Sequence, residues 1–233
     1  MVRQLYTAWT GMRNEQNRLD VIANNLANSA TVGYKKEGVT SQSFDKQLMV
    51  KIRDASVDWR KEQIGRMSFG VKVGEVYTDY KQGSLRESGN TFDFAIDGDG
   101  FFAIEYTNAN GQTSTQYTRA GQFTITKEGY VVDVGGNVYA DGELVDTIVL
   151  TDFEDYDYLK KFGETRCFPV QGAREKEATG FVRQGFTEQS NVNVVSEMVN
   201  MIAITRAFEA NQKVVQTVDS TLEKAVNTLG SVS

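Results

Sequence analysis

An acidic, glycine-rich segment, residues 97–100 (DGDG), is the first candidate for ligand chemistry in this sequence. At positions 3 to 6 of a 12-residue calcium loop it would put Ala95 at position 1 and Tyr106 at position 12, where oxygen ligands are required. The same glycines begin the pattern G-x-G-x-x-A, but residues 101–106 (FFAIEY) resemble a strand rather than the helix that would hold a pyrophosphate. The segment therefore predicts a β-turn between two strands, without a metal or a cofactor.

Two groups of carboxylates could serve as the acid and base of a glycan-cleaving enzyme. In the first group, Asp93 and Asp97 do not share the strand parity of the neighbouring apolar residues, and the second group lies in a charged, irregular segment. We therefore expect both groups to be solvated surface and assign no catalytic residue. The candidates are Asp93, Asp97 and Asp99, and then Asp152, Glu154, Asp155 and Asp157.

Histidine is absent from the chain, and cysteine occurs once, at Cys167. These two facts exclude Ser-His-Asp and Cys-His catalytic pairs, zinc sites built from histidine or from several cysteines, and an internal disulfide. Arg166 precedes Cys167, but because no histidine can act as its base we expect an ordinary, partly buried thiol.

The net charge of −6 is unevenly distributed along the 233 residues. Residues 1–36 carry five basic and two acidic side chains, whereas residues 37–182 carry sixteen basic and twenty-four acidic ones. Since phosphate binding needs a basic stripe, nucleic acid is not an expected partner. The charges in the first twenty residues interrupt any apolar signal region, and no run is long enough to span a membrane, so we expect neither a cleaved signal peptide nor a membrane span.

The chain ends carry heptad repeats, which are typical of helices that pack against a partner. Near the N-terminus the repeat is Leu5, Met12, Leu19 and Leu26, with Trp9 and Ile22 at intervening positions. Near the C-terminus apolar residues keep the same step for 36 residues, or about 54 Å of helix. A strict seven-residue repeat predicts a left-handed supercoil. The C-terminal series is Val194, Met201, Phe208, Val215, Leu222 and Leu229, joined by Met198.

The middle of the chain alternates short apolar segments with turn dipeptides such as Asn110-Gly111 and Asp141-Gly142, a pattern typical of antiparallel hairpins. The spacing of Phe44, Leu48 and Ile52 predicts a short helix, and we interpret residues 151–180 as an irregular connector. The predicted fold class is α+β: two terminal heptad helices that pair as a coiled-coil-like stalk, with a central antiparallel sandwich or small barrel. The expected divisions are an N-terminal helical arm (1–36), a connector (37–66), a β-rich domain (67–182) and a C-terminal helical arm (183–233).

Four motifs, in order along the chain, resemble those of the bacterial flagellar rod, hook and hook-associated axial proteins. The first comprises residues 23–28 (ANNLAN) and 31–36 (TVGYKK). The others are residues 83–85 (GSL) with 94–102 (FAIDGDGFF); residues 117–123 (YTRAGQF); and residues 189–195 (QSNVNVV), 197–199 (EMV) and 206–211 (RAFEAN). At 233 residues the chain is too short for the outer domains of hook proteins, which favours a rod subunit.

The resemblance implies a non-enzymatic structural subunit of the flagellar basal-body rod, a helical tube that transmits torque from motor to hook. It implies export through the flagellar type III apparatus, and partners that are copies of this chain and other axial proteins. The alternatives are a short hook-type axial protein, or a secreted cell-wall binding or hydrolysing module on a coiled-coil stalk. The resemblance does not separate proximal from distal rod subunits.

We expect the heptad residues and several helical amides to form the assembly interface, since an unpartnered buried amide would cost about 1 to 3 kcal/mol and so reject wrong registers. The expected interface residues are Leu5, Trp9, Met12, Leu19, Ile22, Leu26, Asn24, Asn25, Asn28, Val194, Met198, Met201, Phe208, Asn211, Val215 and Leu222.

Overall fold

The computed structural model describes residues 2–50, 63–107, 113–123, 131–132, 137–140, 143–148 and 150–230. The chain divides into two compact units. Unit 1 comprises Met1–Ala23, Gly38–Tyr77 and Met198–Ser233, and unit 2 comprises Asn24–Glu37 and Thr78–Glu197. Both long helices cross a boundary between the units.

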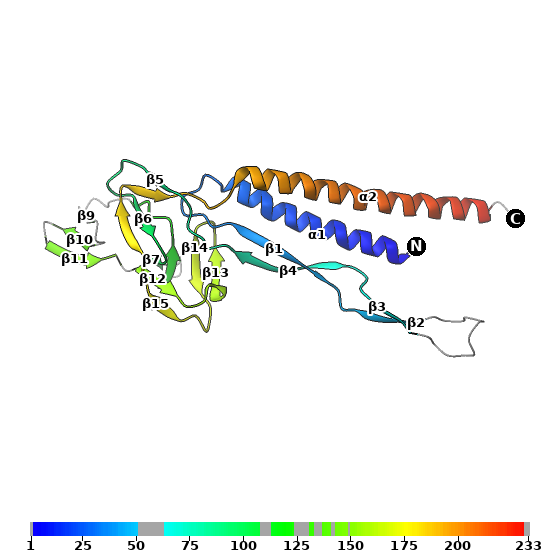
Figure 1. Cartoon of the computed structure of the whole chain (residues 1–233), viewed down its shortest axis with the longest axis horizontal. Helices are drawn as coiled ribbons and strands as arrows, with labels where there is room; N and C mark the ends of the chain where they lie inside the picture. Colours follow the sequence, from blue (N-terminus) through cyan, green and yellow to red (C-terminus); the bar gives the residue numbers. More distant parts are fainter. Residues whose placement is uncertain are drawn as a thin grey trace. The chain divides into compact units, whose positions relative to one another are not determined.

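Two helices and two strand pairs form unit 1. Helix α1 (Val2–Ala27) and helix α2 (Val194–Gly230) run side by side, with the two chain ends at the same end of the pair (Figure 1). At Gly11 an added Cβ would lie 3.0 Å from Asn211 Nδ2, so the two helices approach closely there. The strand pairs are β1 (Glu37–Ser43) with β4 (Val71–Thr78), and β2 (Gln47–Val50) with β3 (Gln63–Met67).

The local sequence explains where the helices begin and end. The side chain of Asn193 accepts a hydrogen bond from the backbone N–H of Ser196 at 3.1 Å, which satisfies one of the open donors at the start of α2. The sole proline of the chain, Pro169, lies outside both helices. The helices predicted at the chain ends are confirmed, whereas their heptad packing as a coiled coil stays a prediction.

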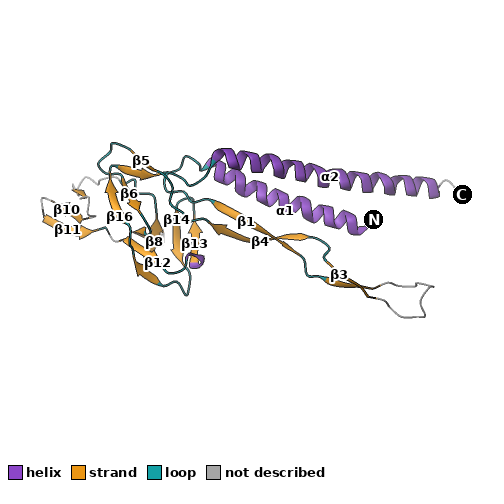
Figure 2. Ribbon diagram, in the orientation of Figure 1, coloured by secondary structure: helices purple, strands orange, loops and turns teal. Residues whose placement is uncertain are grey.

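The regular secondary structure of unit 2 is mostly strand, as Figure 2 shows. Its main sheet has six strands in the order β13-β14-β8-β7-β12-β15, and every pair in it is antiparallel. The strands are β7 (Phe101–Thr107), β8 (Thr113–Thr118), β12 (Leu150–Phe153), β13 (Leu159–Phe162), β14 (Arg166–Pro169) and β15 (Glu175–Glu177), with the 3-10 helix η1 (Tyr156–Tyr158) before β13.

Smaller strand groups complete unit 2. Strand β6, which pairs with β16, consists of residues 94–97 of the second motif. Strand β5 pairs with β17, the last strand before α2. The elements are β5 (Leu85–Glu87), β6 (Phe94–Asp97), β16 (Phe181–Gln184), β17 (Phe186–Glu188), and a three-stranded group of β9 (Val131–Val132), β10 (Asn137–Ala140) and β11 (Glu143–Thr147).

Strand β7 supplies two separate apolar cores. Phe101 lies with Tyr117, Phe153, Leu159 and Cys167, whereas Phe102 lies with a second cluster that includes residues of β6. Consecutive residues of a strand point to opposite faces, so Phe101 and Phe102 place one cluster on each face of the sheet. In the first cluster, the rings of Tyr117 and Phe153 meet edge to face with centroids 4.9 Å apart.

Two expectations about the connecting segments are wrong. Residues 47–50 form strand β2, with Leu48 opposite Arg66, instead of a short helix. Leu48 lies in β2, whereas Phe44 lies in the link between β1 and β2, so the pairing of β2 with β3 takes the place of the helix that the spacing of four suggested; Ile52 lies outside the described residues. The segment 151–180 contributes β12, β13, β14 and β15 to a sheet, and several of its charged residues, such as Asp152 and Lys160, lie on paired strands.

The turn predicted at residues 97–100 is confirmed between β6 and β7, with Gly98 at φ 111° and Gly100 at φ 133°. Among the described helices, we find no segment long and apolar enough to cross a bilayer.

Candidate functional site

The loop that follows α1 is held against the β region of unit 2 at Gly33. Its φ of +72° is in the left-handed region, and its N–H donates to the carbonyl of Glu188 at 2.8 Å. A Cβ at Gly33 would come within 2.4 Å of the backbone nitrogen of Ala120. Gly33 lies beyond the end of helix α1 at Ala27, and a glycine is needed there for the close approach of two backbones.

Three buried charged residues meet beside this loop: Lys35, Arg119 and Glu188, which we name the charge hub. Glu188 is fully buried, and Lys35 and Arg119 are 6% and 3% exposed. Lys35 Nζ donates to Glu188 Oε1 at 2.6 Å, and Arg119 Nη1 to Glu188 Oε2 at 3.4 Å. Glu188 Oε1 also accepts from the backbone N–H of Gly83 at 2.8 Å, and Arg119 Nη1 donates to the carbonyl of Gly98 at 2.9 Å.

The hub therefore connects three of the sequence motifs with the residue directly before the fourth. Lys35 belongs to the first motif, Gly83 and Gly98 to the second, Arg119 to the third, and Glu188 directly precedes the fourth. Sequence reasoning did not identify Lys35, Arg119 or Glu188 as site residues, because charged residues are usually solvated. The available signal was the presence of a charged residue within or beside each motif.

Burial is the largest influence on the pKa of Lys35, the lysine of the charge hub. It lowers the pKa of Lys35, while Glu188 acts in the opposite direction and the nearby cation Arg119 lowers the pKa further. A buried ion of either sign is costly unless its partner is present, so the three side chains stabilise the fold only as a set.

A second group of contacts surrounds the hub and fixes the segments on either side of it. Asn191 Nδ2 donates to the carbonyl of Asp79 at 2.7 Å, and its Oδ1 accepts from the backbone N–H of Lys36 at 2.8 Å. Lys36 also pairs with Glu197 at 2.6 Å, in the first turn of α2. These bonds join the chain just after α1, the chain around the start of α2 and the segment between β4 and β5.

The helical amides predicted for an interface have different environments. Asn25 is fully buried; its Nδ2 donates to the carbonyl of Glu37 at 2.7 Å, and its Oδ1 accepts from Tyr34 Oη at 3.1 Å. Asn28 is also buried and donates to Asn24 Oδ1 at 2.7 Å. Asn25 and Asn28 therefore order the chain after α1, whereas Asn211 lies at the approach of α2 to Gly11.

The predicted apolar interface residues lie along α1 and α2 and are mostly half-buried in the single chain. Trp9 and Met198 are the exposed members, at 47% and 49%. The half-buried members are Leu5, Met12, Leu19, Ile22, Leu26, Val194, Met201, Phe208, Val215 and Leu222. Their role in assembly stays a prediction.

The expectation that both carboxylate groups are solvated is wrong for two residues. Asp93 and Asp152 are only 6% and 5% exposed. Asp93 accepts from Asn90 Nδ2 at 3.3 Å, and Asp152 from Tyr156 Oη at 2.8 Å, so a polar partner offsets the burial of each. Asp97 pairs with Arg183 at 2.6 Å on the surface. Within the described residues, no group of three or more acidic, cysteine or histidine side chains is placed to hold a metal.

Cys167 should resist alkylation in the native protein. It is 4% exposed, and burial raises the pKa of its thiol to about 12, so the thiolate that reacts with iodoacetamide is scarce at pH 8. We expect little modification of the folded chain within an hour and complete modification in guanidinium chloride, measured by mass spectrometry. Rapid native labelling would contradict the buried position of this side chain.

Comparison with known families places the motifs in one group of proteins. Residues 5–35 match the family model described as flagella basal body rod protein, residues 95–153 that of the flagellar hook protein FlgE/F/G D1 domain, and residues 183–228 that of the flagellar basal body rod FlgEFG protein C-terminal. The chain is 31% identical to the flagellar basal-body rod protein FlgG of Bacillus subtilis (strain 168), over 97% of this chain and 99% of the relative. The chain belongs to the flagellar basal-body rod protein family.

Similarity extends to two kinds of rod protein in this family. The flagellar basal-body rod protein FlgF of Mesorhizobium japonicum is also 31% identical, over the whole of both chains, and FlgF of Rhizobium meliloti is 31% identical over 97% of each. The charge hub of this rod-family chain takes one residue from each matched region: Lys35 from the first, Arg119 from the second and Glu188 from the third.

Proposed function

We propose that this chain is a structural subunit of the flagellar basal-body rod, which assembles into a helical tube and transmits torque from motor to hook. The observation that carries the proposal is whole-length similarity: rod proteins of two kinds match 97 to 100% of the chain at 31% identity. The proposed location is the basal body, reached through the flagellar type III export apparatus without a cleaved signal peptide. The proposed partners are other copies of the chain and neighbouring axial proteins.

The proposed assembly surface is formed by the paired helices of unit 1. Met198, Val199 and Ile202 on α2 are 49 to 60% exposed in the single chain and would become buried against a neighbouring copy. Each subunit would use different patches for the copies above and below, so that the contacts do not close and the tube can grow. The amide Asn211 and the half-buried heptad residues would set the register between helices.

A second candidate in the same class is a short hook-type axial protein. It is favoured by the match of residues 95–153 to a family model described for a hook protein D1 domain. Both candidates are structural, and the proposal gives the chain no catalytic step.

Electron microscopy of purified basal bodies tests the proposal. An epitope tag inserted next to Gly163, at an exposed turn between β13 and β14, should be detected by gold-labelled antibody on the segment between the rings and the hook. Label on the hook would favour the second candidate. Basal bodies that are intact but carry no label would contradict both, provided that the tagged cells swim.

A further inference from the structure

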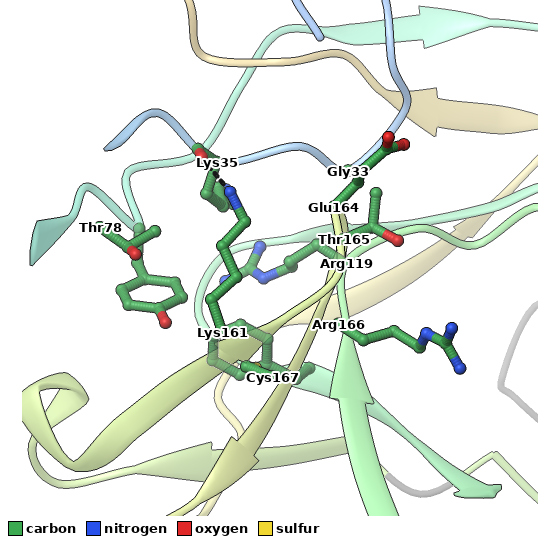
Figure 3. Close-up of a pocket in the computed structure, with 11 residues that line it drawn as sticks. Gly33, Lys35, Thr78, Arg119, Lys161, Glu164, Thr165, Arg166 and Cys167 are labelled. Carbon is green, nitrogen blue, oxygen red and sulfur yellow. Dashed lines mark hydrogen bonds between the residues drawn. The ribbon is translucent and has the colours of Figure 1, made fainter. Parts of the chain in front are cut away.

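Unit 1 contains a far larger hollow than the one beside the charge hub. The cavity next to Lys35 and Arg119 (Figure 3) measures about 20 Å³ and has room for one water molecule. The hollow in unit 1 measures about 630 Å³ and lies between the first turns of α1 and the residues at the start of β2 and before β4. We name it the aromatic groove. It is lined by Arg3, Tyr6, Phe44, Asp45, Gln47 and Phe69.

The aromatic side chains of the groove are held in place within the single chain. The rings of Tyr6 and Phe44 stack with their centroids 6.4 Å apart, and the guanidinium of Arg3 lies over the ring of Phe69 at 5.4 Å. Thr7 Oγ1 donates a hydrogen bond to the carbonyl of Phe69 at 3.0 Å, which fixes this segment against α1. A preformed, largely apolar surface with a few polar groups is typical of a binding site.

The first turns of α2 in unit 1 carry an exposed apolar surface, which we name the α2 patch. It consists of Met198, Val199 and Ile202, which the helical repeat places on one side of α2. Ile204 is two residues further on, on the opposite side of the helix, and is 4% exposed. Because this part of α2 is apolar on two opposite sides, we expect the exposed side to be covered by a partner.

The groove and the patch have complementary charges. Asp45 lines the groove, and Arg206 follows Ile202 by one helical turn on the same side of α2. Arg3 lines the groove too, and Glu209 lies three residues beyond Arg206. All four charged residues are exposed, and within the described residues none of them forms an ion pair. Each cation therefore has an available carboxylate on the other surface, which favours a specific contact.

One chain cannot bring its own patch into its own groove. The two helices are antiparallel, since both chain ends lie at the same end of the pair (Figure 1), and Gly11 lies opposite Asn211. From that level Tyr6 lies five residues toward the chain ends, whereas Ile202 lies nine residues in the other direction. The groove and the patch are therefore about 21 Å apart along the helix axis.

We propose that the aromatic groove binds the α2 patch of a second copy of this chain. The proposal rests on the proposed function, because it names two of the surfaces through which subunits assemble. Val199 and Ile202 enter between the rings of the groove, while Asp45 pairs with Arg206 and Arg3 with Glu209. Each contact joins two different surfaces, so one groove and one patch stay free at the ends of a row of copies, and the row can grow.

Cysteine cross-linking in purified basal bodies tests the contact. Gln47→Cys places a thiol in the groove and Val199→Cys one in the patch, and the native Cys167 is buried. With both substitutions in the full chain, we expect a short bismaleimide to give a ladder of dimers and larger oligomers on a denaturing gel. Gln47→Cys with Lys213→Cys is the matched control. Lys213 is exposed on α2 about 21 Å beyond Val199, so this pair should give no ladder.

The outcomes separate this inference from the proposed function. Basal bodies that contain the doubly substituted chain but give no ladder would overturn the contact and leave the rod assignment intact. An equal ladder with the Lys213→Cys pair would show a different register, and would also overturn it. Absence of the chain from intact basal bodies would overturn the proposed function, and this inference with it.

Charge reversal gives the second measurement. Asp45→Arg and Arg206→Asp change exposed residues, so each variant should unfold at the same guanidinium chloride concentration as the unmodified protein. We expect each to lower the yield of hook-bearing basal bodies by about fivefold or more, since like charges would meet at every contact between copies. The double variant should recover most of the yield. A double variant no better than the worse single variant would overturn the pairing of Asp45 with Arg206.

Discussion

Replacing Glu188 with alanine should destabilise the folded chain by about 3 to 5 kcal/mol, because it leaves Lys35 and Arg119 buried without the carboxylate that they share. That loss is a large fraction of the total stability of an ordinary domain, about 5 to 15 kcal/mol. The change also removes the acceptor of the Gly83 N–H. Guanidinium chloride unfolding of the full chain, followed by tryptophan fluorescence and circular dichroism, measures the free energy.

The matched control for this prediction is Glu154→Ala. Glu154 pairs with Arg174 at 3.8 Å, but both side chains are well exposed, at 58% and 82%, so its loss should cost at most about 0.5 kcal/mol. Glu188→Gln separates charge from hydrogen bonding: it keeps an acceptor for Gly83 but removes the charge, and it should still cost most of what alanine costs. A cost below about 1 kcal/mol for Glu188→Ala would mean that the hub does not hold the motifs together.

The second large effect is expected in cells that carry Phe208→Asp. Phe208 is half-buried on α2, in the middle of the C-terminal heptad series, and our proposal buries it further when subunits assemble. An unpaired carboxylate in that position costs several kcal/mol even after relaxation. The main β sheet lies in the other unit, so we expect the variant to be exported with a protease-resistant middle region, yet to fail to form rods, and the cells to be non-motile.

Lys213→Glu is the control on the same helix, because Lys213 is exposed and the change buries no charge. Motility on soft agar and the yield of hook-bearing basal bodies measure both variants. Normal swimming and intact basal bodies with Phe208→Asp would show that this series is not an assembly surface, and would favour a protein in which the helices form only a stalk.

The charge hub gives the family motifs a structural meaning. Several of their glycines and charged residues resemble parts of a ligand site, but here Gly33 and Gly83 allow backbones to approach and Glu188 pairs with two cations. An added Cβ at Gly83 would come within 1.9 Å of the carbonyl oxygen of Gln189, so that contact too requires glycine. We infer that these motifs are needed to join the segments next to both helices to the β region.

The sequence by itself determined those features that depend on local periodicity. Heptad spacing without proline predicted α1 and α2, and glycines between apolar segments predicted the turn that joins β6 to β7. These predictions succeeded because helix and turn formation depend on residues a few positions apart. The pattern of Phe44 and Leu48 failed because it is only local: Phe44 lies between β1 and β2, and the pairing of β2 with the more distant β3 makes Leu48 part of a strand.

Only the tertiary structure decided where the charged residues lie. Lys35 and Glu188 are 153 residues apart, and Arg119 and Glu188 are 69 apart, so no local pattern could pair them. Sequence reasoning treated Asp93 and Asp152 as solvated, but the fold buries them beside Asn90 and Tyr156. A charged side chain can be buried when a distant segment brings its partner, and that partner exists only once the chain has folded.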